Sequence, residues 1–218
     1  MRLNRHIYLG TWVTDFVQYL LDYDASTTLL IVCSTREAFL NQLLVITRVH
    51  SRETAESHPI LTKSLGLLSN STRFKIAYCP TLENLRAYLS VLPLSGNSAQ
   101  KTVAEYQEMR RPLMAILDLV FVHTQTPEFS AQGLSRTFAT AVEAASREGM
   151  DLVLCECQDA ANSVDGERGE VLWYTNIPLL NNSVRRGEST WLGRSVPVNR
   201  VVQRWFQFNE PNHSAMDM

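Results

Sequence analysis

An apolar run from Leu113 to His123 (LMAILDLVFVH) dominates the hydrophobic pattern of the chain, and it contains a single charged residue, Asp118. A run of this kind is typical of a strand buried on both faces, as in a parallel sheet that helices cover. The amphipathic segment GLSRTFATAVEAASRE follows at residues 133–148, and a second apolar run, DLVLCECQ, occupies residues 151–158. This order of strand, loop, helix and strand predicts the central crossover of a doubly wound α/β sheet.

The pattern on either side of this crossover also alternates between helices and strands. Apolar residues at three- and four-residue spacing after Thr11 predict a first helix, and the β-branched run TTLLIVC at residues 27–33 predicts the first strand. The last third of the chain predicts the strands of a hairpin, separated by a basic loop. The further expected elements are a helix at 38–50, a polar segment at 51–71, a strand at 74–79, a helix at 81–92 and a loop at 93–100.

Composition agrees with a globular domain. The chain has 218 residues, of which 45% are hydrophobic and 19% are charged, and its net charge is −2. We expect one domain over residues 1–210, with an N-terminal helix within residues 1–26 packed on it and a loose tail at 211–218. We find no signal peptide, no membrane span and no cysteine framework, so we expect an intracellular protein that makes no membrane contact.

The chemistry of a nucleotide site is incomplete in this sequence. Asp118, within the central run, stands where a nucleotide-binding fold places a metal-binding carboxylate, but no G-x-x-x-x-G-K-[ST] phosphate loop occurs anywhere in the chain. Without that loop the β and γ phosphates of a triphosphate would lack their usual amide and lysine donors. We therefore favour a buried, hydrogen-bonded carboxylate for Asp118 over a magnesium ligand, and we expect no cofactor and no metal.

No catalytic group can be assigned either. We expect the thiols of Cys155 and Cys157 to point to opposite faces of their strand and to serve as core side chains. The histidines at 50, 58 and 123 lack metal-ligand spacing, and no G-x-S-x-G nucleophile motif is present. The sequence accordingly favours a protein without catalytic residues.

The positive signal is a set of arginines late in the chain, in a stretch of twenty residues where Glu188 is the only acid. Asparagines and Trp191 accompany them, and arginine forks with amide donors and an aromatic ring suit a phosphate backbone, particularly that of single strands. An alternative stays open, in which a solvated loop pairs these arginines with the acidic segment 148–170. The candidate nucleic-acid-binding residues are Arg185, Arg186, Arg194, Arg200 and Arg204.

Three consecutive stretches carry a resemblance to a known family. They are TTLLIVCSTREAFLNQLL, TRFKIAYCPTLENLRAYLSVL and the segment from RPLMAILD to LVLCECQ. Their order is similar to the core of RecA-like recombinases and their paralogues, in which Asp118 matches the place of the Walker B aspartate. The resemblance covers about residues 27–208 and implies a RecA-like, mostly parallel sheet with helices on both faces. With no phosphate loop and a small size, the chain looks most like the smaller, non-ATPase subunit of the fungal Shu complex.

That resemblance implies a function. Such a subunit would form a heterodimer with another RecA-like paralogue, bind single-stranded or forked DNA and promote recombinase filament assembly in homologous recombination and DNA repair, in the nucleus. In that family a late basic loop binds DNA, and by position this role falls on Arg185 and Arg186, and then on Arg194, Arg200 and Arg204. The alternatives are a RecA-like accessory subunit of the Elongator complex, which binds transfer RNA in a hexameric ring, a degenerate NTPase, and a scaffold without nucleic-acid contact.

Overall fold

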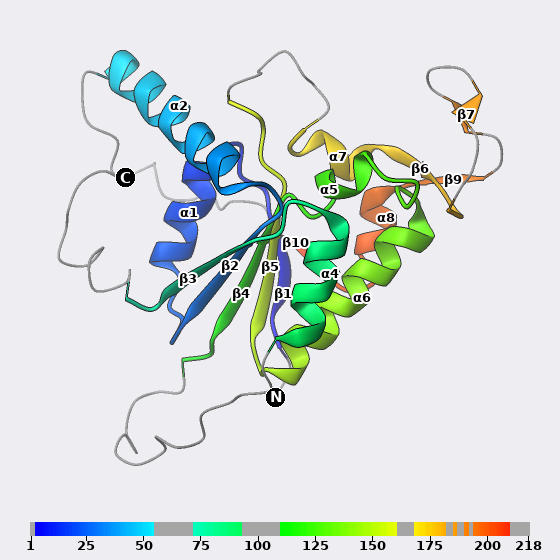
Figure 1. Cartoon of the computed structure of the whole chain (residues 1–218), viewed down its shortest axis with the longest axis horizontal. Coiled ribbons are helices and arrows are strands. Elements are labelled where there is room, and N and C mark those ends of the chain that lie inside the picture. The colour runs from blue at the N-terminus through cyan, green and yellow to red at the C-terminus, as the bar shows by residue number, and fades with distance from the viewer. Residues whose placement is uncertain are drawn as a thin grey trace, which may run out of the picture.

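A sheet of six parallel strands forms the centre of the computed structural model, which describes residues 3–54, 72–92, 110–160, 168–181, 185–186, 190–191 and 194–209. The strand order is β10-β1-β5-β4-β2-β3 (Figure 1). In chain order these strands are β1 (Arg5–Tyr8), β2 (Thr28–Val32), β3 (Phe74–Tyr78), β4 (Leu113–Leu117), β5 (Asp151–Cys155) and β10 (Gln207–Asn209).

The three strands with continuous apolar sequence are the most deeply buried. Every residue of β2, β4 and β5 is buried, because helices cover both faces of the sheet at these strands. Leu117 pairs with Val32 on one side and with Cys155 on the other, so β4 is an internal strand. The predicted doubly wound α/β sheet with an internal strand at Leu113 is therefore confirmed.

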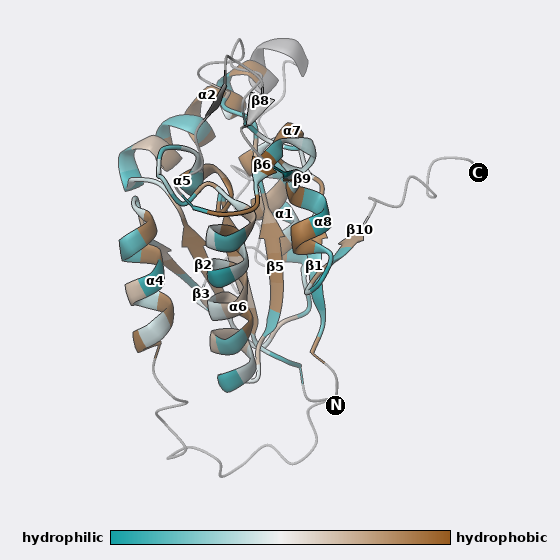
Figure 2. Ribbon diagram, turned by 90° about the vertical axis from the view of Figure 1, so that its right-hand side faces the viewer, coloured by the Kyte–Doolittle hydropathy of each residue, from teal (hydrophilic) through white to brown (hydrophobic). Residues whose placement is uncertain are grey.

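Helices of the described residues form two covering layers, as Figures 1 and 2 show from two directions. Phe16 of one layer and Phe138 of the other each lie in a separate apolar core, and the sheet lies between them. No helix in the described ranges is long and apolar enough to cross a membrane. The first layer contains α1 (Val13–Asp22) and α2 (Arg36–Thr54), and the second contains α4 (Leu82–Val91), α6 (Ala131–Arg147) and α8 (Val198–Val202).

The strand β1 was not predicted from the sequence. β1 is only four residues long and includes Arg5 and His6, so it presents no apolar run. It nevertheless lies inside the sheet, between β5 and β10. His6 is buried there with its Nε2 2.7 Å from the hydroxyl of Tyr19 on α1. The first strand of the sheet is therefore β1, and the helix predicted after Thr11 follows it as α1.

The prediction of a strand over the whole run from Leu113 to His123 was wrong in its second half. The strand ends at Leu117, because Asp118 adopts a left-handed conformation with φ of 62° that turns the chain out of the sheet. A short helix, α5 (Phe121–Thr124), follows, although Leu119 and Val120 remain fully buried. The apolar run thus correctly indicated buried residues, but only its first five residues pair as a strand.

The predicted C-terminal hairpin is confirmed in its antiparallel pairing, but the same stretch also contains two short helices, and its last strand, β10, pairs parallel with β1 in the main sheet. β6 (Asn176–Pro178) pairs antiparallel with β9 (Ser195–Pro197), and between them β7 (Arg185–Arg186) pairs antiparallel with β8 (Thr190–Trp191). A short helix, α7 (Val171–Tyr174), leads into this hairpin, and the β7 segment projects away from the body of the domain (Figure 1). Residues 55–71 and the predicted loop at 93–100 lie outside the described residues, as does the expected tail at 211–218.

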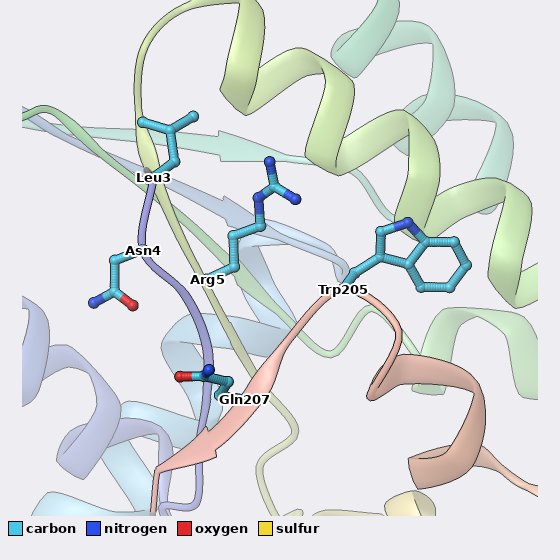
Figure 3. Close-up of a pocket in the computed structure, with 5 residues that line it drawn as sticks. All are labelled: Leu3, Asn4, Arg5, Trp205 and Gln207. Atoms are coloured by element: carbon cyan, nitrogen blue, oxygen red, sulfur yellow. The ribbon is translucent and has the colours of Figure 1, made fainter. Parts of the chain in front are cut away.

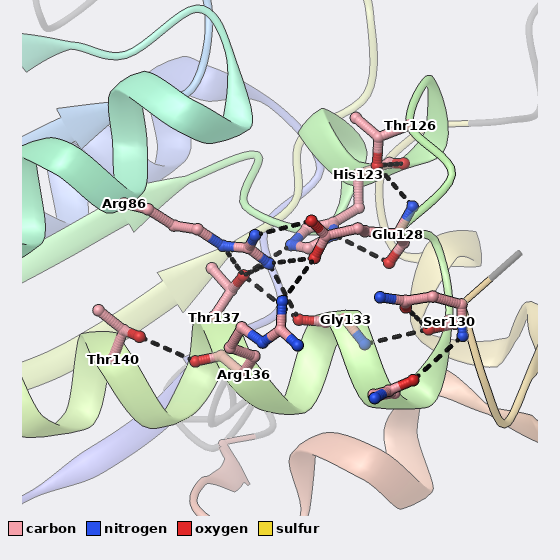
Figure 4. Close-up of polar contacts among 11 residues, drawn as sticks. Arg86, His123, Thr126, Glu128, Ser130, Gly133, Arg136, Thr137 and Thr140 are labelled. Atoms are coloured by element: carbon pink, nitrogen blue, oxygen red, sulfur yellow. Dashed lines mark hydrogen bonds and ion pairs between the residues drawn. The ribbon is translucent and has the colours of Figure 1, made fainter.

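A closed ring of hydrogen bonds joins the second helical layer (Figure 4). Arg86 of α4 donates to both carboxylate oxygens of Glu128, at 3.0 and 2.7 Å, and to the hydroxyl of Thr137 on α6. Thr137 is also 3.0 Å from Nε2 of His123, whose Nδ1 lies 3.2 Å from the carbonyl oxygen of Glu128. Gly133 permits this approach, because a Cβ atom there would lie 2.1 Å from the same carbonyl oxygen.

The ring fixes the protonation of His123. A carbonyl oxygen only accepts, so Nδ1 carries the proton and the bare Nε2 accepts from Thr137. The side chain is fully buried, and this burial lowers its pKa from 6.5 to about 4. Because the neutral form is favoured in the folded state, the unfolded chain takes up the proton first as the pH falls, and stability decreases from pH 6.5 toward pH 4.

We predict that replacing His123 with Gln flattens the dependence of stability on pH. The shift in the pKa of His123 corresponds to about 3 kcal/mol of unfolding free energy between pH 7 and pH 4. Urea unfolding at pH steps across this window measures it, with the unsubstituted chain as reference. Glu128 and His6, whose pKa values are also lowered, are present in both proteins, so the comparison isolates the contribution of His123. An unchanged slope in the variant would show that His123 is not the titrating group.

Candidate functional site

A buried charged cluster lies where β4 and β5 end, at the carboxyl edge of the sheet. Asp118 is 2% exposed, and its Oδ1 accepts a hydrogen bond of 3.0 Å from the backbone N–H of Cys157. Its own N–H donates to the carbonyl oxygen of Cys155 at 2.8 Å. The buried, hydrogen-bonded carboxylate that we favoured for Asp118 is therefore confirmed.

Arg168 supplies the positive charge of this cluster. Its Nη2 lies 2.8 Å from Oδ2 of Asp118, and its Nη1 lies 3.0 Å from Oδ2 of Asp159. The guanidinium also stacks over the ring of Phe121 at 3.9 Å from the ring centroid. One largely buried arginine therefore bridges two carboxylates and holds the chain after β5 against the chain after β4.

Glu156 completes the cluster from the residue after β5. It is 2% exposed, and its two oxygens accept from the backbone N–H groups of Val120 and Phe121, at 2.6 and 3.1 Å. These bonds satisfy the first amides of the turn that the left-handed Asp118 creates. Both oxygens of Glu156 thus bind backbone amides of the chain after β4.

Burial governs the protonation of both acids. Burial raises the pKa of Asp118, and the guanidinium of Arg168 counteracts this. Burial raises the pKa of Glu156 well above its ordinary value, and the charge of Asp118 raises it further. The cluster therefore favours a protonated Glu156 beside an ion-paired Asp118. Within the described ranges, no three histidine, cysteine or acidic side chains are arranged to hold a metal ion.

The cysteine prediction was wrong in its geometry. The sulfur atoms of Cys155 and Cys157 lie 3.5 Å apart, because residues two apart in an extended segment share a face. Both thiols are buried, as expected of core residues, and the neighbouring thiol and burial raise the pKa of Cys157 well above its ordinary value. Burial likewise raises the pKa of Cys33 and of Cys79. None of these three shifts favours a reactive thiolate.

The loop from β1 to α1 has a negative charge at its end. It comprises residues 9–12, and the backbone N–H of Trp12 donates to the carboxylate of Asp15 at 3.1 Å. The carbonyl oxygen of Thr11 accepts from the backbone N–H of Gln158 at 3.0 Å. Asp15 therefore occupies the N-terminal end of α1, where an unoccupied helix end would attract an anion.

The five predicted arginines do not form one cluster. Arg185 and Arg186 form β7 of the hairpin, and Arg194 follows β8 with an exposed side chain, its carbonyl oxygen accepting from the N–H of Leu179. Arg200 lies on α8, and Arg204 lies in the turn that leads into β10, at the opposite, amino edge of the sheet. Three of the arginines thus belong to the hairpin. The other two lie on the segment that leads from the hairpin to β10, at the amino edge of the sheet.

Three carboxylates of the acidic segment pair with other arginines. Ion pairs join Asp151 to Arg111, Glu148 to Arg147 and Asp159 to Arg168. None of the ion pairs found among the described residues involves Arg194, Arg200 or Arg204. Among the described residues, no ion pair therefore joins these three arginines to the acidic segment.

The sequence reading missed the role of Arg168. Its position as the only basic residue from 148 to 170 was visible, but its partner Asp118 lies 50 positions earlier. The one available signal was charge balance, because a carboxylate within an apolar run needs a buried cation or hydrogen-bond donors. Which cation serves it depends on how the chain folds back after β5.

These features define an α/β protein with an all-parallel, six-stranded sheet, an internally neutralised carboxyl edge and a basic hairpin beside it. The profile of the family described as SPAC22G7.03-like matches residues 7–212, and the chain belongs to this family. No curated protein matches the sequence.

We predict that Arg168→Met destabilises the fold by about 3–5 kcal/mol, because it leaves the charge of Asp118 buried without a partner. Asp118→Asn should restore a large part of this loss in the double variant, since asparagine tolerates the left-handed conformation and carries no charge. Urea unfolding of the four proteins of this cycle measures the coupling, for which we expect at least about 2 kcal/mol. Additive effects would show that the ion pair does not hold the carboxyl edge.

Proposed function

We propose that the protein is a non-catalytic DNA-binding subunit, similar to the smaller subunit of the fungal Shu complex. It would act in the nucleus as one partner of a RecA-like paralogue heterodimer that promotes recombinase filament assembly in homologous recombination. The observation that carries this proposal is the antiparallel hairpin that begins at β6 and ends at β9. It projects from the domain and bears Arg185, Arg186 and Arg194.

The hairpin suits a phosphate backbone for a physical reason. A two-stranded ribbon brings two consecutive arginines to a position that projects from the domain. Arginine forks grip phosphate oxygens and do not read base identity unless they reach a groove. The net charge of −2 of the whole chain means that this attraction is local.

The carboxyl edge supports a subunit without ATPase activity. A triphosphate needs amide donors at the loop after a strand and a metal-binding acid nearby. Here the carboxylate of Asp15 occupies the N-terminal end of α1, and Arg168 is paired with Asp118. A bound triphosphate would therefore have to displace Asp15 and compete with a buried ion pair.

Exposed apolar side chains support a partner subunit. Leu40 and Leu44, one turn apart on α2, are 41% and 51% exposed, and Ile76 on the edge strand β3 is 46% exposed. A partner that covers α2 and β3 would remove this surface from water, at roughly 25 cal/mol per Å² of apolar area.

We predict that the double variant Arg185→Gln, Arg186→Gln binds DNA more weakly whatever its sequence. Losing two phosphate contacts should reduce the slope of log affinity against log salt by about 1.4 on single strands and about 1.8 on duplex. Fluorescence anisotropy at a series of salt concentrations measures both quantities. The matched control is Arg36→Gln, Arg48→Gln, which removes the same charge from exposed positions on α2.

Three outcomes would contradict the proposal. Equal salt slopes for the hairpin variant and its control would leave the hairpin without a role. ATP turnover that Asp118→Ala abolishes would favour a degenerate NTPase. Assembly into a six-membered ring with a preference for transfer RNA would favour an Elongator-type subunit.

We also predict that Leu40→Glu, Leu44→Glu prevents recovery of a RecA-like partner on purification from the native cell. A charge in an apolar interface is left without solvation when the partner binds. The control Val91→Glu, at an exposed apolar residue of α4 in the other helical layer, should recover the partner normally, and circular dichroism verifies that both variants fold. Normal recovery with the glutamate variant would place the interface elsewhere.

A further inference from the structure

A cavity of about 350 Å³ opens at the amino edge of the sheet, where β1 and β10 begin (Figure 3). We call it the amino-edge cavity, and it is lined by Leu3, Asn4, Arg5, Trp205 and Gln207. It lies at the edge opposite to the Asp118 cluster and the hairpin, because these two strands run parallel to β5. Its size falls within the range of small-molecule sites.

The side chains around the cavity offer one cation, one aromatic surface and two amides. In Figure 3 the guanidinium of Arg5 lies between Leu3 and the indole of Trp205. Trp205 is half-buried and packs against Phe138 with 6.1 Å between ring centroids, which fixes the indole on a core residue. The arrangement combines a positioned aromatic ring with a planar, five-donor cation.

The charge of Arg5 is not compensated within the described part of the chain. No ion pair found there involves Arg5, while Asp151, at the start of β5, already pairs with Arg111 and accepts from the backbone N–H of Asn4. Arg204, adjacent to Trp205 in sequence, adds a second exposed cation at this edge. The surroundings of the cavity therefore favour an anion.

We propose that the amino-edge cavity binds a single unstacked nucleotide. The base would stack on the indole of Trp205, the phosphate would bind Arg5 and Arg204, and the amides of Asn4 and Gln207 would lie near the base edge. Aromatic stacking together with an arginine is the combination that holds unpaired nucleotides. A free nucleotide and single-stranded DNA offer the same chemistry to this cavity. Only the second of these ligands rests on the proposed function.

Isothermal titration calorimetry of the full chain tests the proposal. The probes are thymidine 5′-monophosphate, thymidine, inorganic phosphate, a single-stranded oligothymidylate and a blunt duplex. We expect the monophosphate to bind at least about tenfold more tightly than thymidine or phosphate alone, because it uses both the ring and the cation. Tighter binding of oligothymidylate than of duplex would identify single-stranded DNA as the source, and tighter binding of the monophosphate than of oligothymidylate would identify the free nucleotide.

Substitutions assign the binding to this cavity. Arg5→Gln should weaken monophosphate binding at least about tenfold, and Trp205→Leu at least about fivefold, whereas Trp205→Phe should retain most of it. Arg36→Gln, which removes an equal charge at the opposite edge, should have no effect. Thermal unfolding verifies that Trp205→Leu folds, and Arg5→Gln carries the test if it does not.

The results separate this site from the hairpin. The variant Arg185→Gln, Arg186→Gln should weaken oligothymidylate binding and leave monophosphate binding unchanged. Monophosphate binding without any oligonucleotide binding would support the cavity and overturn the proposed function. Absence of monophosphate binding, or monophosphate binding that Arg5→Gln does not change, would overturn the cavity whatever the hairpin does.

Discussion

The ion pair of Asp118 with Arg168 is the interaction on which the carboxyl edge of this protein depends. Asp118 ends β4 in a left-handed conformation, and its carboxylate is almost entirely removed from water. A buried carboxylate is costly unless hydrogen bonds and a cation compensate it. The N–H of Cys157 and the guanidinium of Arg168 supply both. The chain after β5 must therefore pack against the end of β4, where Asp118 lies.

The same requirement occupies the polar groups that the structure describes at this edge. Arg168 binds Asp118 and Asp159 together, and Glu156 binds the amides of Val120 and Phe121. The polar groups that an open α/β sheet usually offers to a ligand here bind one another. Positive charge available to a partner lies instead on the hairpin and, on the opposite side of the sheet, around Arg5 and Arg204.

Part of this arrangement follows from local sequence. The strands β2, β4 and β5 were predicted because strands buried on both faces are continuously apolar, and the helices α4 and α6 because their apolar residues recur at helical spacing. β1 was not predicted because Arg5 and His6 are polar and interrupt any apolar pattern, although His6 is buried against Tyr19. The strand at β4 was predicted six residues too long, since Leu119 and Val120 are buried without being paired.

The sequence by itself determined the fold class, the internal place of the central strand, the hairpin and the arginines that the hairpin carries. Periodicity and composition act over neighbouring residues, and these features depend on nothing more distant. Only the tertiary structure decided that Arg168 pairs with Asp118, that the thiols of Cys155 and Cys157 meet, and that Arg5 and Trp205 line one cavity. Each of the contacts of Arg168 and of the amino-edge cavity joins residues far apart in the chain, so the crossovers of the sheet, rather than any local pattern, bring the partners together.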